Sequence, residues 1–247
     1  MKKFLLITSR TNEEILQPEL AAYRELTGLG DTGLEWHRVE RDFLAGINPH
    51  DYAGIILGGS PFTISVANSL KDELELKVEK ALAGLLDTVV AADIPFLGIC
   101  YGIGTLGSHQ GATIDMRYGE TARAANIRLT AAGKTDQLFA QMPHEFDAYV
   151  GHKEAVSVPS PAMTVLAGSL DCPVQAFRVG QNVYAVQFHP ELRSQDFVNR
   201  LRLYANHGYF DPTRFDDLCD HVFAADVAAS HQILRRFVEI YSDGAGE

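Results

Sequence analysis

The chain has 247 residues, 46% of them hydrophobic, and a net charge of −11, a composition typical of a folded globular protein. The acidic balance disfavours nucleic-acid binding, which needs a basic face. No apolar run is long enough to span a membrane, and the apolar stretch after Met1 is too short for a signal peptide. Three cysteines in a chain of this length disfavour a disulfide framework and favour a reducing, cytoplasmic compartment.

The first hundred residues alternate between strand-like and helix-like segments. Apolar runs predict strands over residues 2–9, 34–39, 52–57 and 94–99. Helical spacing predicts helices over residues 12–26, broken near Pro18, and 70–92, with Ser69 and Asp72 forming a capping box at the start of the second. This order predicts an α/β fold, with a largely parallel central sheet flanked by helices and its active site at the carboxyl ends of the strands.

The pattern changes after residue 124. Short strand candidates separated by turn residues predict extra antiparallel strands over residues 124–130, 145–150, 155–158, 163–169, 174–179 and 182–188. From residue 194 the spacing of apolar side chains indicates helices. We expect one domain over residues 1–192 and a C-terminal helical extension over residues 193–247 packed on the same domain, with its last five residues frayed.

Cys100 follows the apolar run that ends at Ile99, with a glycine two residues before it and another two residues after it. A sharp turn from a strand into a helix needs small residues around it. Such a turn exposes one side chain above the sheet edge and points backbone N–H groups of the new helix at whatever that side chain attacks. The alternative is that Cys100 is a small buried hydrophobe, the kind of structural role that we assign to Cys172 and Cys219.

A glycine pair marks a second turn. Gly58-Gly59-Ser60-Pro61 follows the strand predicted over residues 52–57, at a point where the backbone approaches another group closely. The segment is either an ordinary tight turn or a loop beside Cys100. The second interpretation gains weight because both features lie at the carboxyl ends of predicted parallel strands.

His189 and Glu191 follow the last strand candidate and are separated by Pro190. If the extended backbone continues through Pro190, both side chains project to the same side. A carboxylate beside an imidazole fixes its tautomer and stabilises the imidazolium. A Cys100 thiolate then has a partner that accepts its proton and later returns it to a leaving amine. Taken separately, His189 is interpreted as a structural histidine and Glu191 as a solvated glutamate. Taken together with Cys100, the two residues predict a catalytic triad.

Two motifs, Gly98-Ile99-Cys100-Tyr101-Gly102 and Gln187-Phe188-His189-Pro190-Glu191, resemble in order and separation those of the class I (triad) glutamine amidotransferase family. Within that family they are most similar to the amidotransferase domain of GMP synthase. The likeness extends over residues 2–192 and implies the flavodoxin-like fold of the family, with no cofactor and no metal.

The resemblance also implies a mechanism. Cys100 attacks the side-chain amide of glutamine or of another γ-glutamyl substrate, His189 oriented by Glu191 protonates the departing ammonia, and water hydrolyses the glutamyl thioester. The oxyanion hole is assigned to the backbone N–H groups of Gly59 and Tyr101. Substrate contacts are assigned to Gly58, Gly151 and His152.

Two departures from the family pattern leave alternatives open. Gly104 stands where many members have a glutamine that holds the substrate. About 55 residues follow Leu192, too few for a nucleotide-binding synthetase, and they lack a phosphate-binding glycine loop. The chain is expected to be a stand-alone amidotransferase that supplies ammonia to a separate synthetase, a γ-glutamyl peptidase or hydrolase on the same scaffold, or a catalytically silent regulatory subunit.

Overall fold

The computed structural model describes residues 2–205 and 208–242. Within these residues the chain forms a nine-stranded sheet in the order β2-β1-β3-β4-β11-β10-β9-β6-β7. Five neighbouring strands pair in parallel: β2 (Leu34–Arg38), β1 (Phe4–Thr8), β3 (Gly54–Leu57), β4 (Phe96–Ile99) and β11 (Val183–Val186). The next four pair antiparallel: β10 (Ala176–Val179), β9 (Thr164–Gly168), β6 (Glu120–Leu129) and β7 (Glu145–His152).

A separate two-stranded sheet pairs β5 (Thr113–Asp115) with β8 (Ala155–Val158). The helices of four or more residues are α1 (Glu13–Thr27), α2 (Gly30–Gly33), α3 (Val39–Asp42), α4 (Glu73–Ala91), α5 (Tyr101–His109), α6 (Ser194–Leu203), α7 (Phe215–Ala224) and α8 (Ala228–Ser242). The predicted α/β fold, with a parallel sheet, flanking helices and extra antiparallel strands, is confirmed.

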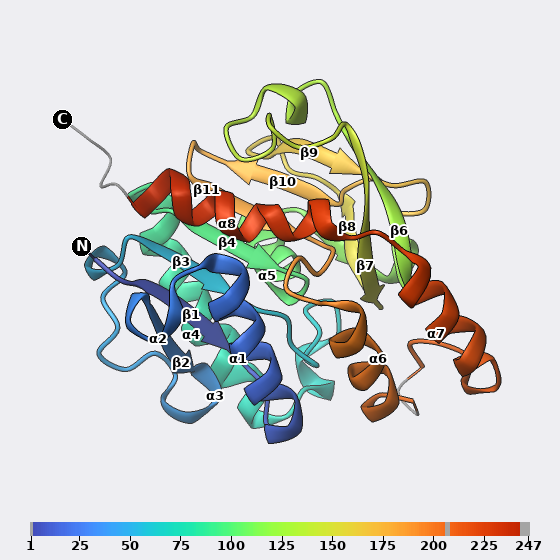
Figure 1. Ribbon diagram of the computed structural model, residues 1–247. Helices are drawn as coiled ribbons and strands as arrows, with labels where there is room; N and C mark the ends of the chain where they lie inside the picture. The colour runs from blue at the N-terminus through green and yellow to red at the C-terminus, as the bar shows by residue number, and fades with distance from the viewer. Residues whose placement is uncertain (1, 206–207, 243–247) are drawn as a thin grey trace.

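Helices cover both faces of the parallel part of the sheet. On one face α1 and α8 lie side by side, and on the other lie α4 and α5 (Figure 1). The central strands serve both layers because their side chains alternate: on β1, Leu6 packs with the α1 and α8 layer, while Leu5 and Ile7 pack with the α4 layer. Burial on both faces explains why these strands are continuous apolar runs.

The break predicted near Pro18 does not occur, because α1 runs through that residue. The apolar face of α1, including Leu20 and Tyr23, is buried in the core. Burial of this face outweighs the one backbone hydrogen bond that proline cannot donate.

The start of α4 also differs from the prediction. Asp72 is the residue that caps the helix, and its side chain accepts a hydrogen bond from the Glu75 N–H at 2.8 Å. The preceding segment, Asn68–Leu70, forms a separate turn of 3₁₀ helix in which the Leu70 side chain is exposed. The cap therefore lies three residues later than the capping box indicated, because an aspartate is as good a cap as a serine.

Helices dominate the end of the chain, as the spacing of its apolar side chains predicts. We call residues 193–242 the C-terminal helical segment; residues 206–207 and the predicted frayed end, 243–247, lie outside the described residues. In this segment α6 packs on α7 and α1, α7 contacts β6, and α8 contacts α1 and β7. The segment thus packs against the antiparallel end of the sheet, at β6 and β7, and against α1.

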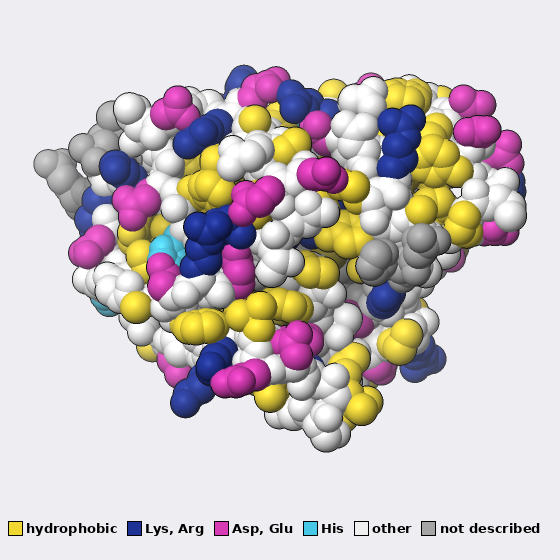
Figure 2. Space-filling view, turned by 90° about the horizontal axis from the view of Figure 1, so that it is seen from below, with side chains coloured by type: hydrophobic (Ala, Val, Ile, Leu, Met, Phe, Trp, Pro, Cys, Tyr) yellow, Lys and Arg dark blue, Asp and Glu magenta, His cyan; other side chains and the backbone are white. Residues whose placement is uncertain are grey.

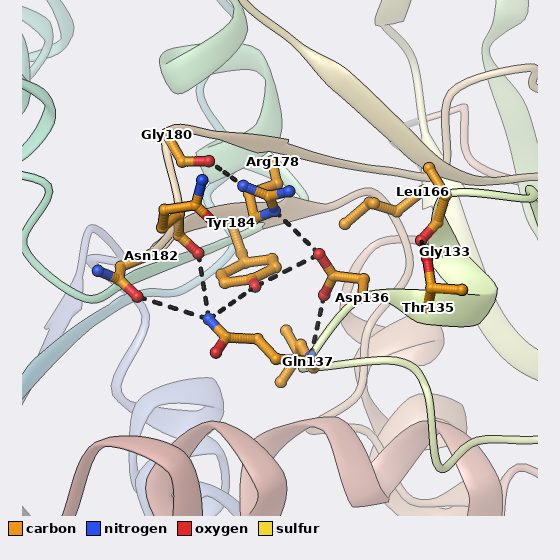
Figure 3. Close-up of polar contacts among 12 residues, drawn as sticks. Gly133, Thr135, Asp136, Gln137, Leu166, Arg178, Gly180, Asn182 and Tyr184 are labelled. Carbon is orange, nitrogen blue, oxygen red and sulfur yellow. Dashed lines mark hydrogen bonds and ion pairs between the residues drawn. The ribbon is translucent and has the colours of Figure 1, made fainter. Parts of the chain in front are cut away.

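A polar cluster around Asp136 and Gln137 joins the loop after β6 to β10 and β11 (Figure 3). Asp136, in the loop that follows β6, accepts a hydrogen bond at 2.9 Å from Nε of Arg178, which lies on β10. Beside it, Gln137 Nε2 donates to the Tyr184 hydroxyl at 3.2 Å and to the Tyr241 hydroxyl at 3.0 Å. Because Tyr184 lies on β11 and Tyr241 on α8, the cluster links the last helix to the centre of the sheet.

The surface shown in Figure 2 carries acidic, basic and apolar side chains interspersed with one another. Strongly exposed apolar side chains, such as Leu70, Met116 and Leu170, lie on separate segments of the chain. Over residues 2–205 and 208–242, no helix combines the length and apolar character that crossing a membrane requires.

Candidate active site

Three neighbouring parallel strands bring the predicted reacting groups to one edge of the sheet. Gly59 follows β3, Cys100 follows β4 and His189 follows β11. Because the carboxyl ends of parallel strands lie at the same edge, residues far apart in the sequence meet there. Cys100 and His189 line the same pocket.

Cys100 occupies a strained turn between β4 and α5. Its φ of 53° and ψ of −89° lie outside the regions that L-residues ordinarily adopt. Its N–H is held by the Val186 carbonyl at 2.8 Å. The flanking glycines are required by space, since a Cβ on Gly98 would lie 2.8 Å from the carbonyl carbon of Gly102. The turn therefore has the geometry of a nucleophile elbow.

His189 and Glu191 form a buried pair beside this turn. The His189 Nδ1 lies 2.8 Å from Glu191 Oε1, and the His189 backbone N–H donates to the Tyr149 carbonyl at 2.8 Å. Glu191 is fully buried, and His189 is 6% exposed. Cys100 is close enough to His189 to raise the pKa of the imidazole. The three residues of the predicted triad thus lie next to one another.

The pair is charged in the folded protein. Burial lowers the pKa of His189, but the charge of Glu191 and the neighbouring Cys100 outweigh burial and raise this pKa to about 9. Burial raises the pKa of Glu191, but the His189 charge and its hydrogen bond, with Arg200, lower it to about 2. At neutral pH His189 therefore carries a proton that it can donate to a leaving group.

Two backbone N–H groups adjoin the Cys100 side chain. Tyr101 opens α5, and Gly59 lies so close to the site that an added Cβ would be 3.1 Å from His189 Cε1 and 3.6 Å from Cys100 Cβ. Neither N–H donates to a partner in the part of the chain that the structure describes. Such unpaired donors beside a nucleophile suit the stabilisation of an oxyanion.

The three predicted substrate contacts differ in position. Gly151 and His152, at the end of β7, line the pocket. The His152 ring is itself held by Glu120, whose Oε2 lies 2.9 Å from His152 Nε2. Gly58 is not among the residues that line the pocket in the described chain, and its N–H bonds back to the Ile7 carbonyl at 2.9 Å. Gly58 therefore continues the pairing of β3 with β1.

Gly104 faces a loop that fills the space beside it. A Cβ there would lie 3.3 Å from Ile64 Cγ1 and 3.4 Å from Glu154 Oε1. The Glu154 carboxylate accepts hydrogen bonds from the N–H groups of Ile64 at 2.7 Å and Ser65 at 2.8 Å. The loop after β3 thus occupies the region where a longer side chain at residue 104 would lie.

Several pocket residues were not predicted from the sequence. Gln187, buried beside the nucleophile, has its Nε2 4.0 Å from Cys100 Sγ. Many of the others come from the ends of β1 and β7 and from the C-terminal helical segment: Arg10, Lys153, Phe197, Arg200, Leu201, Tyr204 and Tyr209. Arg10 could have been found, because it follows a central strand at the same edge of the sheet. The residues after Leu192 give no such signal.

One group of side chains has the residue types of a metal site. Potential ligand atoms of Glu120, His152 and Cys172 lie within 4.8 Å of one another, and all three residues are buried. The Glu120 carboxylate, however, already accepts hydrogen bonds from His152, Gln175 and Arg123. The Arg123 guanidinium, 2.6 Å from Glu120 Oε1, opposes a cation there. Burial raises the pKa of Cys172 to about 12, which suits a structural thiol.

Comparison with known proteins gives a consistent picture. The model of the family described as "Glutamine amidotransferase class-I" matches residues 24–202. The GMP synthase [glutamine-hydrolyzing] of Bacillus subtilis is 31% identical over 166 residues, which are 67% of this chain and 29% of that protein. The corresponding enzyme of Streptococcus thermophilus is 29% identical over 176 residues, 68% of this chain and 29% of that protein. The chain therefore spans under a third of the length of these relatives.

Solved structures share the fold. A glutamine amidotransferase from Thermotoga maritima superimposes with a TM-score of 0.76 at 16% identity, covering 99% of this chain and 100% of that one. A glutamine amido transferase from Methylobacillus flagellatus gives a TM-score of 0.69 at 14% identity, covering 97% of this chain and 95% of that one. At these identities the superpositions establish the architecture.

Proposed function

Because the chain belongs to the class I glutamine amidotransferase family, we propose that it hydrolyses the side-chain amide of glutamine through Cys100, His189 and Glu191. The ammonia released is transferred to an acceptor. One observation carries the proposal: Cys100 lies on a strained elbow and lines the same pocket as His189, whose Nδ1 is 2.8 Å from Glu191 Oε1. This is the arrangement that a cysteine nucleophile and its acid–base partner need.

In the first half of the reaction Cys100 Sγ forms a bond to the amide carbon. Negative charge develops on the amide oxygen, where the N–H groups of Gly59 and Tyr101 stabilise it; one such donor contributes about 3 kcal/mol. The C–N bond then breaks, and the proton on His189 goes to the departing nitrogen, which leaves as ammonia. Glu191 holds the imidazole in place and stabilises its charge.

In the second half, water attacks the thioester. Neutral His189, left after the first step, accepts a proton from the water as its oxygen bonds to the acyl carbon. The C–S bond breaks, glutamate is released, and the thiolate of Cys100 and the imidazolium of His189 are restored. The same two side chains thus serve both halves of the reaction.

The test is glutamate release from free glutamine by the purified protein. Cys100→Ala is expected to abolish release and leave the circular dichroism spectrum unchanged. Cys219→Ser is the matched control, since Cys219 lies on α7 and does not line the pocket; it is expected to keep wild-type turnover. Release that survives in Cys100→Ala would disprove the mechanism.

A γ-glutamyl peptide is the second candidate substrate, and the side chains that line the pocket favour it. Lys153 and Tyr209 line the same pocket as Cys100, and the Tyr209 ring lies 5.1 Å from Lys153 Nζ. A peptide attached to the γ-carboxyl would place its terminal carboxylate near the Lys153 ammonium. Release of the amino acid from a γ-glutamyl dipeptide, faster than of ammonia from glutamine, would favour this substrate.

The acceptor of the ammonia is proposed from the relatives. The GMP synthases that match this chain combine glutamine hydrolysis with a synthetase reaction in their names. A synthetase is therefore the class of partner that we propose. Stimulation of glutamate release by such a synthetase and its nucleotide substrate, with no stimulation in Cys100→Ala, is the expected result.

A further inference from the structure

A chain of buried ionic contacts leads from the triad to two distant segments. Arg200, on α6, has its Nη1 3.3 Å from Glu191 Oε1 and its Nη2 2.9 Å from Glu19 Oε1. Glu19, on α1, also accepts hydrogen bonds from Arg10 Nε, at 3.1 Å to each carboxylate oxygen. The guanidinium of Arg200 therefore bridges the triad carboxylate and α1.

The burial of this chain makes each partner necessary. The side chains of Glu19 and Glu191 are fully buried, those of Arg10 and Arg200 are 5% and 11% exposed, and the two cations balance the two anions. Removing one partner from a buried ion pair leaves an uncompensated charge in a medium that solvates it poorly. A neutral side chain at residue 200 would thus leave the triad carboxylate to find another position or partner.

The contacts of Glu191 show what Arg200 does for the triad. A single oxygen, Oε1, accepts hydrogen bonds from both His189 Nδ1, at an N···O distance of 2.8 Å, and Arg200 Nη1, at 3.3 Å. The carboxylate is therefore held between an imidazole and a guanidinium. Rotation of Glu191 away from His189 would break both contacts at once.

We propose that Arg200 is a positioning residue, which holds Glu191 against His189 and fixes both relative to α1 through Glu19. The C-terminal helical segment is then part of the catalytic apparatus, although it carries none of the reacting groups. The expected effect of Arg200 on turnover rests on the proposed function, whereas its expected effect on the ionisation of His189 does not.

Two effects of opposite sign make the proposal testable. If Glu191 stayed in place without Arg200, loss of a nearby positive charge would raise the pKa of His189 above about 9. If Glu191 moved away, burial would dominate and the pKa would fall. The other ionisable groups nearby include Cys100, facing His189, and Tyr23, Glu19 and Arg10, on the Glu191 side. His231, on α8, lies beside the same segment, with its Nδ1 2.7 Å from the Pro190 carbonyl oxygen.

The experiment is an NMR titration of ¹⁵N-histidine-labelled protein, with the signal of His189 identified by its loss in His189→Gln. In Arg200→Met we expect the pKa of His189 to fall by one unit or more from about 9. We also expect kcat for glutamine to fall about tenfold, as acid–base catalysis is impaired, with KM changed less than twofold. A pKa that stays or rises would overturn the proposal.

Arg193, the N-cap residue of α6, offers a matched control. Its Nη1 lies 2.6 Å from Glu25 Oε2, so it also joins α6 to α1, but it does not contact Glu191. Arg193→Met should leave the pKa of His189 and kcat unchanged. Equal effects of the two substitutions would show that only the docking of α6 matters, and would also overturn the proposal.

Two further provisions keep the outcome decisive. If Arg200→Met does not fold, Arg200→Lys keeps a cation in place but carries all its N–H groups on one nitrogen, so it lacks the planar fork whose two nitrogens reach Glu19 and Glu191. A smaller fall in the pKa of His189 is then expected, and no fall would overturn the proposal. If the wild type releases no glutamate, the proposed function fails, while the titration still decides the role of Arg200.

Discussion

Replacing Glu191 by glutamine removes the charge of the triad carboxylate with little change of shape. In the wild type His189 has a pKa of about 9, against an ordinary value of 6.5, although burial acts to lower it. That difference corresponds to about 3 kcal/mol in favour of the imidazolium. Glu191 is the first of the groups that raise this pKa, ahead of Cys100. Most of the stabilisation should therefore disappear in Glu191→Gln.

The size of the effect on turnover follows from the proton on His189. With a pKa near 6.5 in the variant, the imidazolium fraction at pH 8 falls from about 0.9 to about 0.03, a loss of roughly 30-fold. Cys100 and the oxyanion donors remain, so turnover is impaired but not abolished. At pH 6, where His189 is mostly protonated in both proteins, the difference should be much smaller.

The assay is glutamate release across the range from about pH 6 to pH 10. The wild type should lose kcat/KM as the pH rises through about 9, because the general acid loses its proton. In Glu191→Gln this decline should begin about two pH units lower. An unchanged alkaline limb would refute the electrostatic reasoning. A loss as complete as that in Cys100→Ala would show that Glu191 does more than orient and charge His189.

Two other predictions concern glycines. Gly104→Gln should raise KM for glutamine several-fold, because a side chain of that length displaces the loop that carries Ile64. Gly104→Ala should leave KM unchanged, because its Cβ, 3.3 Å from Ile64 Cγ1, requires that side chain to shift by only a few tenths of an ångström. A lowered KM in Gly104→Gln would contradict this. Gly133→Ala should destabilise the fold by about 2 kcal/mol or more in urea unfolding, since its Cβ would lie 2.1 Å from the backbone oxygen of Leu166. As control, Gly84→Ala meets nothing within 4 Å inside α4 and should stabilise by about 0.8 kcal/mol; equal effects would refute the steric argument.

The positions of the triad residues could be predicted because their signals are local. Cys100 and His189 each follow a run of apolar residues, and the rule for parallel strands places the ends of such runs at one edge. The structure has both residues there, on the neighbouring strands β4 and β11. Their catalytic roles stay a prediction, which Cys100→Ala and Glu191→Gln test.

The surroundings of the triad could not be predicted in the same way. Arg200 lies nine residues after Glu191, a spacing that carries no signal on its own, and it reaches the triad only because α6 packs on α1. Glu19 reads in the sequence as one more acidic residue of an amphipathic helix, yet it is fully buried between two arginines. Such partners depend on how helices meet in three dimensions, which one sequence does not specify.

The structure separates the parts of the chain that provide chemistry from those that shape the pocket. The proposed nucleophile, its acid–base partner and the oxyanion donors all follow β3, β4 and β11, whose pairing fixes their relative positions. Part of the wall comes instead from the C-terminal helical segment, with Phe197, Leu201, Tyr204 and Tyr209. Changes in that segment can alter the lining of the pocket without disturbing the elbow. Arg200 is the exception, because it belongs to that segment and contacts the triad, so α6 contributes both to the wall of the pocket and to the surroundings of Glu191.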